Sequence, residues 1–174
     1  MTDPRYPIGP LRVPASFTPE WRRESIDQIA QAPSRFREAV RGLSEEQLST
    51  PYRPGGWTVR QVVHHLPDSH VNAYVRLKLA LTEDVPTIKP YEEARWAELP
   101  DSSSVPVEVS LSLLDSLHAR WVALLRSMSA TDFQRQYTHP ETGKHTLDYL
   151  LAMYAWHGAH HTAHVTQLRR DKGW

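Results

Sequence analysis

Apolar positions recur at three- and four-residue spacing along four long stretches of the chain, which is the period of an amphipathic helix. These stretches cover residues 18–41, 57–82, 107–128 and 146–170. No part of the chain shows a convincing series of strands with alternating apolar and polar positions. The pattern therefore predicts an all-α protein, built as a four-helix bundle.

Residues typical of helix ends support these boundaries. Thr18 has a hydroxyl that can cap the first helix, and proline and glutamate follow it in the first turn. Gly42 is placed to end that helix. Ser44 and Gln47 have the spacing of a capping box, which predicts a short helical turn, and Thr58 is placed to cap the second long helix.

Prolines define the connections and disturb two of the helices. Residues 1–17 are proline-rich and should form an extended arm, and residues 83–106 should form a long crossing connection. Residues 137–144 are expected to be a loop. Pro33 should break or kink the first helix, and Pro67 should kink or loosen the second, because proline removes a backbone donor.

Composition narrows the class of protein. A chain of 174 residues fits one domain spanning residues 1–174, and it contains no cysteine, so thiolate ligands and a cysteine nucleophile are excluded. Twenty basic and twenty acidic residues cancel, which argues against a nucleic-acid or anionic-membrane partner. No segment resembles a signal peptide or approaches about 20 apolar residues. We therefore expect a soluble, cytoplasmic protein.

Ten histidines are many for this length, and four of them lie close together in the last helix. His157 and His161 fall at the centre of its apolar stripe, four residues apart, so their rings share one face. His164 lies toward one flank and His160 near the edge. Two imidazoles within an apolar stripe are costly unless their nitrogens are satisfied. A metal ion would satisfy one nitrogen of each ring, which favours a metal site over a pair of structural histidines.

The second group of histidines lies in the second long helix. His70 falls near the centre of that helix's apolar stripe, His65 on its flank, and His64 on the far side, where we expect it to face solvent. Periodicity alone nominates His70 ahead of His65 as a third ligand. A kink at Pro67 would make the angular count unreliable, so spacing leaves the two nearly equal.

At these residues the chain resembles the DinB/YfiT-like superfamily, and most closely its YfiT branch of metal-dependent hydrolases. The resemblance covers nearly the whole length, in the segments YPIG, YRPGGWTVRQVVHHLPDSHVNAYVRLKLALTE, LHARWVALL and YAWHGAHHTAHV. The family motif of a tryptophan and, eight residues later, a histidine followed by Leu or Val matches Trp57 and His65, and the family's histidine pair matches His157 and His161. Pro67 departs from the pattern, since relatives usually carry a small helix-forming residue there.

The resemblance implies an up-down-down-up bundle, often a homodimer, with one zinc or nickel ion per chain on His65, His157 and His161. Three imidazoles that leave a fourth position open are typical of a catalytic site. Nitrogen ligands suit zinc or nickel rather than calcium or magnesium.

Three functions fit such a site. The first is a metal-dependent hydrolase that activates water for attack on a small-molecule substrate. The second is an S-transferase for a low-molecular-weight thiol such as bacillithiol or mycothiol, as in relatives within the superfamily. The third is a non-catalytic metal-binding stress-response bundle. We favour the hydrolase, because the most similar branch carries that description.

Catalytic residues beyond the ligands are only weakly indicated. Asp68 and Ser69 lie one turn from His65 and would either accept a proton there or cap the Pro67 kink, of which capping is favoured. His118 lies on the apolar side of the third long helix, and a structural role is slightly favoured over contact with a metal-site water. His164 and His70 are candidates for proton transfer or substrate binding at the rim of the site.

Overall fold

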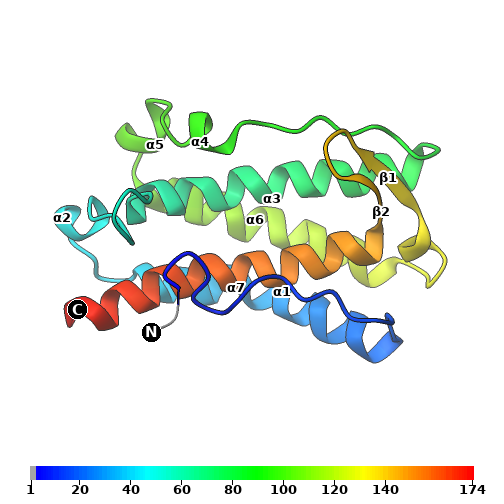
Figure 1. Cartoon of the computed structure of the whole chain (residues 1–174), viewed down its shortest axis with the longest axis horizontal. Helices are drawn as coiled ribbons and strands as arrows, with labels where there is room; N and C mark the ends of the chain where they lie inside the picture. The colour runs from blue at the N-terminus through cyan, green and yellow to red at the C-terminus, as the bar shows by residue number, and fades with distance from the viewer. Residues whose placement is uncertain (1–2) are drawn as a thin grey trace.

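The computed structural model describes residues 3–174, and its main elements are four long helices. These are α1 (Pro19–Val40), α3 (Val59–Thr82), α6 (Val107–Ser127) and α7 (Leu147–Lys172). In Figure 1, α1 and α7 run in one direction and α3 and α6 in the other, so the bundle is up-down-down-up. The predicted four-helix bundle is confirmed.

A long connection allows α3 and α6 to run in the same direction. It follows α3 and returns along the bundle to the start of α6 (Figure 1). It contains two short helices, α4 (Glu93–Trp96) and α5 (Asp101–Ser104). The predicted crossing connection over residues 83–106 is therefore present, with more helical structure than the proline content indicated.

The helices begin at the residues that the sequence indicated. The Thr18 hydroxyl accepts a hydrogen bond from the Trp21 backbone amide at 3.1 Å, and Ser44 caps α2 (Glu45–Leu48) through a capping box. Thr58 forms a second capping box with Gln61 at the start of α3. These contacts satisfy amide donors that the first turn of a helix leaves without partners.

Neither internal proline interrupts its helix. Both α1 and α3 continue through Pro33 and Pro67, so the expected break at Pro33 is wrong. Proline at position 33 has no N–H to donate to the Ile29 carbonyl four residues earlier. That carbonyl instead accepts a hydrogen bond from His118 Nδ1 at 2.7 Å, which compensates for the missing helical bond.

The segment after α6 contains strands where a loop was expected. A 3₁₀ turn, η1 (Asp132–Gln134), leads into an antiparallel hairpin of β1 (Gln136–His139) and β2 (Gly143–Thr146). Thr138 also exchanges backbone hydrogen bonds with Pro86 and Ile88 of the crossing connection, at 2.9 Å each. The prediction of a loop over residues 137–144 was wrong, because this pairing depends on a segment that is distant in sequence.

Two apolar clusters fill the bundle, and buried histidines separate them along the helices. The cluster toward the hairpin includes Ile29, Leu77, Trp121 and Leu151. The other includes Phe36, Val62, Leu114 and Val165. No helix within the described residues is long and apolar enough to cross a membrane. The bundle thus places a polar layer midway along its length, between two regions of ordinary apolar packing.

Candidate metal centre

Three histidine rings meet where α3 faces α7. His65 comes from α3, and His157 and His161 lie one turn apart on α7. One ring nitrogen from each residue lies within 4.8 Å of the others. The ring centroids are 4.5 Å apart for His157 and His161 and 4.9 Å apart for His65 and His161. Of the two candidates that periodicity left open, the structure brings His65 into this group.

Burial keeps the three rings neutral near neutral pH. It lowers the pKa of His65 from 6.5 to about 4, and it lowers the pKa of His157 and His161 well below 6.5, with smaller effects from the neighbouring rings. Loss of hydration disfavours the imidazolium form. A neutral imidazole has a free electron pair on one nitrogen, which is the form that binds a metal ion.

The nitrogens of these rings have few partners of their own. The Nδ1 atom of His161 is buried and has no hydrogen-bond partner among the described residues. None of the hydrogen bonds found within residues 3–174 involves the ring of His65. One nitrogen of the His65 ring belongs to the group that converges within 4.8 Å, so a metal ion would supply the partner that this ring lacks. The residues present fit a site for zinc or nickel.

Trp57 holds the ring of His65 from the side. Its ring centroid lies 4.5 Å from that of His65, with an angle of 52° between the two planes. Trp57 stands just before Thr58, the N-cap of α3, so the capping box also fixes the start of the segment that carries both rings. The tryptophan of the family motif therefore packs directly against the histidine of that motif.

His64 is not exposed, contrary to the sequence-based expectation. Its side chain is 6% exposed, and its Nδ1 atom lies 2.7 Å from the Ser110 hydroxyl oxygen of α6. The expectation failed because α5 and the start of α6 cover the face of α3 that the helical pattern left open. The structure places His64 apart from the three converging histidines.

His70 and His118 are fully buried behind His157. His70 Nε2 lies 3.1 Å from His157 Nδ1, and His70 Nδ1 lies 2.7 Å from His118 Nε2. Neither ring lines the cavity at the metal centre, so His70 does not lie at its rim. The structural role that was slightly favoured for His118 agrees with its bonds to His70 and to the Ile29 carbonyl.

The other two histidines of α7 are covered by the N-terminal arm. His164 Nε2 lies 3.3 Å from the Arg5 carbonyl oxygen, and the His164 ring stacks on Tyr52 with 4.1 Å between centroids. His160 stacks on Trp156 at 4.2 Å. Both residues are buried, although the helical pattern placed them toward the edge and flank of the stripe. His164 does not line the cavity at the metal centre.

Asp68 does not line the cavity at the three histidines. Burial, with a smaller contribution from Asp101, raises the pKa of its carboxyl group from 3.8 to about 6. The neighbouring Ser69 does line the cavity, where its hydroxyl lies 3.4 Å from that of Tyr154. The structure thus brings Ser69, rather than Asp68, toward the site.

The three converging histidines line a cavity of about 640 Å³. Its floor includes the three histidines, and its walls come from α7, the crossing connection and the hairpin. The polar lining residues outside the four long helices are Tyr91, Glu92, Glu93, Tyr137, His139, Glu141, Thr142 and His145. Sequence analysis missed all eight. The one local signal for the lining residues of the hairpin was the short run HPETGKH, in which two histidines flank a glutamate.

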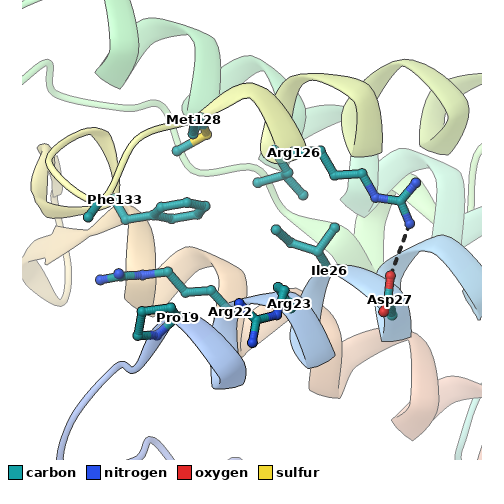
Figure 2. A pocket seen from close by; sticks show the side chains of 10 residues that line it. Pro19, Arg22, Arg23, Ile26, Asp27, Arg126, Met128 and Phe133 are labelled. Carbon is teal, nitrogen blue, oxygen red and sulfur yellow. Dashed lines mark hydrogen bonds and ion pairs between the residues drawn. The ribbon is translucent and has the colours of Figure 1, made fainter.

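A separate cavity of about 430 Å³ lies between α1, the end of α6 and η1 (Figure 2). Its lining combines apolar side chains with arginines, and Arg126 pairs with Asp27 at 3.0 Å across its edge (Figure 2). None of the described residues that line it is a histidine. Within residues 3–174, the one group of three side chains placed to hold a metal ion is that of His65, His157 and His161.

Comparison with known proteins agrees with this geometry. A protein named "putative metal-dependent hydrolase" from Bacillus cereus strain B4264 is 54% identical over 174 residues, which is 100% of both chains. A protein with the same name from Bacillus mycoides strain KBAB4 is 53% identical over the same length. The names of these relatives indicate a metal-dependent enzyme and do not establish its activity.

Two solved structures resemble the chain. YfiT from Bacillus subtilis, described as "a probable metal-dependent hydrolase with an unusual four-helix bundle topology", is 46% identical and superposes with a TM-score of 0.97, over 99% of each chain. The four-helix bundle protein TT2238 shares the fold alone, with 19% identity, a TM-score of 0.57, and coverage of 88% of this chain and 99% of its own. Residues 28–165 match the profile of the DinB superfamily. The chain belongs to the DinB superfamily.

Proposed function

We propose that this protein is a hydrolase that depends on one zinc or nickel ion, held by His65, His157 and His161. The observation that carries the proposal is the convergence of three imidazole nitrogens within 4.8 Å, at the floor of a 640 Å³ cavity. The residues in this converging group are all histidines. An all-nitrogen set favours zinc or nickel over magnesium or calcium.

The geometry suits a catalytic site better than a closed structural one. Three protein ligands leave a coordination position, and the cavity supplies room for a substrate beside it. A divalent ion on three imidazoles supplies Lewis acidity and lowers the pKa of water to about 7. The chain's own residues hold the imidazoles neutral, orient His65 against Trp57 and shield the rings from bulk solvent.

The cavity indicates a small, partly polar substrate. Its lining combines aromatic and apolar side chains from α7 with Glu92, Glu93 and Glu141 from the crossing connection and the hairpin turn. Arg76 is the one arginine among the described lining residues. Its Nε atom is buried without a hydrogen-bond partner within residues 3–174, and one terminal nitrogen donates to the Lys89 carbonyl oxygen at 3.4 Å. A guanidinium group that lines the cavity can donate to an acceptor group on a substrate.

Arg76 is also the observation that supports a second candidate, the thiol S-transferase. Low-molecular-weight thiols carry carboxylates, and a guanidinium group beside the metal centre is suited to bind one. A thiol that coordinates a metal ion loses its proton, which makes it a nucleophile. The same centre thus fits both reactions, and they differ in whether water or thiol enters the product.

A substrate screen with and without thiol separates the candidates. The protein, loaded with zinc or with nickel, is incubated with a panel of esters and amides in thiol-free buffer. We expect hydrolysis that the His157→Ala variant loses. Product formed only after thiol addition, with the thiol incorporated, would establish the transferase instead. The absence of cysteine means that no internal thiol can contribute.

A lack of turnover under both conditions, with metal bound, would favour the non-catalytic metal-binding bundle. The homodimer and the small-molecule substrate that the resemblance implies remain part of the proposal. Sedimentation equilibrium of the purified protein measures the first of these, and the screen measures the second.

A further inference from the structure

A chain of hydrogen bonds joins the backbone of α1 to a ligand of the proposed metal centre. It runs from the Ile29 carbonyl to His118 Nδ1 at 2.7 Å and from His118 Nε2 to His70 Nδ1 at 2.7 Å. It ends with His70 Nε2 and His157 Nδ1 at 3.1 Å. The four groups come from α1, α6, α3 and α7, so every long helix of the bundle contributes one member.

The Ile29 carbonyl, at the start of this chain of hydrogen bonds, lacks its usual helical donor because of the sequence. In a regular helix, the Ile29 carbonyl would accept from the amide of residue 33. Residue 33 is proline, which has no N–H. Pro33 thus exposes a backbone acceptor inside the core, and His118 donates to it. A proline that otherwise looks like a defect in α1 provides the fixed end of the chain.

This fixed end determines where each proton lies. A carbonyl oxygen only accepts, so His118 Nδ1 must carry the proton that it donates. A neutral imidazole has one N–H, so His118 Nε2 is an acceptor, and His70 Nδ1 must be the donor to it. By the same reasoning, His70 Nε2 accepts from His157 Nδ1. The free electron pair of His157 is then on Nε2.

The surroundings keep the rings of the chain neutral and fixed. His70 is 0% exposed and His118 is 2% exposed, and no carboxylate among the described residues hydrogen-bonds to either ring. Tyr154 and Trp121 both meet the His70 ring edge-on, with interplanar angles of 88°. The two rings enclose His70, and the Ile29 carbonyl, which only accepts, leaves one order of donors and acceptors along the chain of hydrogen bonds.

We propose that His118 and His70 are positioning residues, which hold His157 as its Nδ1–H tautomer and present Nε2 for metal binding. The inference rests on the proposed function, in which His157 is a ligand. A hydrogen bond to the second nitrogen of a ligating histidine fixes its ring and raises its basicity. Here that bond is itself fixed by a second ring and a helix carbonyl. His65 and His161 lack any comparable bond within the described residues.

His118 is the best place to test this, because it is two hydrogen bonds away from the metal-binding nitrogen. His118→Leu removes the acceptor for His70 Nδ1. The His70 proton then moves to Nε2, where it can donate to His157 Nδ1, and the His157 proton moves to Nε2. The nitrogen that should bind the metal is thereby protonated. In His118→Gln, the amide oxygen replaces the missing acceptor and restores the original order.

Two measurements follow these changes. Long-range proton–nitrogen NMR spectra of metal-free, nitrogen-15-labelled protein report which nitrogen of each ring is protonated. We expect Nδ1–H for His118, His70 and His157 in the wild type, and Nε2–H for His157 in His118→Leu. Competition with a chromophoric chelator gives the zinc affinity. We expect a loss of about 10- to 100-fold for His118→Leu and an affinity close to wild type for His118→Gln.

His64→Leu is the matched control, since it replaces another buried histidine outside the chain and should retain wild-type zinc affinity. Thermal melts ensure that every variant is compared in its folded state. An Nε2–H tautomer for His157 in the wild type would overturn the inference, as would equal zinc affinities for His118→Leu and His118→Gln. If the wild type shows the expected tautomers but binds neither zinc nor nickel, the proposed function fails and the assigned proton order stands.

Discussion

A buried ion pair at the start of α7 should be the most sensitive single point in the bundle. Asp148 is fully buried, and its carboxylate accepts bonds from Arg22 Nε and a terminal Arg22 nitrogen, at 2.7 Å each. Gln134 Nε2 donates a third bond at 2.7 Å. Asp148 thus ties α1 and η1 to the first turn of the helix that carries two of the three proposed ligands.

The size of the effect follows from burial. The Arg22 side chain is only 12% exposed, so Asp148→Ala would leave its charge poorly hydrated and without a counter-ion. Removal of one partner from such a pair costs about 3–5 kcal/mol. Asp27→Ala is the matched control, because it removes an Arg–Asp pair whose side chains are 58% and 60% exposed. That loss should be about 0–1 kcal/mol.

Urea unfolding followed by circular dichroism measures both free energies of unfolding. We expect Asp148→Ala to lose several times more stability than Asp27→Ala. We also expect it to bind zinc normally at temperatures where it remains folded, because the ligands themselves are unchanged. A loss below about 1 kcal/mol for Asp148→Ala, or one equal to the control, would refute the reasoning from burial.

Two further predictions concern pH and helix packing. Burial lowers the pKa of His65 and His118 from 6.5 to about 4. As the pH falls, these two rings therefore become protonated in the unfolded chain before they do so in the folded chain. The contribution of these rings to the free energy of unfolding of the metal-free protein should be fully present above pH 6.5. It should fall toward pH 4 by about 1.4 kcal/mol per pH unit for each ring. Asp68 has the opposite effect on stability. Its pKa is raised to about 6, so the folded chain takes up this proton at a higher pH than the unfolded chain does. Urea unfolding across this pH range measures the slope, and a constant free energy of unfolding would contradict it. In the second prediction, Gly158→Leu should cost about 1–3 kcal/mol, because a Cβ at Gly158 would lie 3.0 Å from the Ala32 Cβ of α1. Gly158→Ala should cost less, because its side chain ends at Cβ, whereas both variants regain up to about 1 kcal/mol of helix propensity. A leucine variant as stable as the wild type in thermal or urea unfolding would disprove the close contact.

The four long helices were predictable because their signals are local. Thr18, Ser44 and Thr58 cap the helices that begin beside them, and no distant residue is needed to explain those starts. The inward direction of His157 and His161 followed from periodicity for the same reason, since α7 is a regular helix. The choice of His65 over His70 needed the family motif, because both face the bundle interior and differ only in their neighbours.

The remaining features depend on contacts between segments that are distant in sequence. The hairpin has strands of only four residues, and it is supported by Thr138, which donates to the Pro86 carbonyl and accepts from the Ile88 amide. His64 is buried because Ser110 and its surroundings cover it. Pro33 leaves its helix intact because His118, on another helix, bonds to the freed carbonyl. The cavity walls arise in the same way, so their polar residues could not be grouped from sequence alone.

Metal content of the purified protein tests the central claim most directly. We expect the wild type to bind close to one zinc or nickel ion per chain, measured by elemental analysis after dialysis. Loss of one of three protein ligands is severe, so His65→Ala, His157→Ala and His161→Ala should each remove most of it. His64→Ala should retain it. Full metal content in a His157→Ala, His161→Ala double variant that remains folded would contradict the assignment of the site.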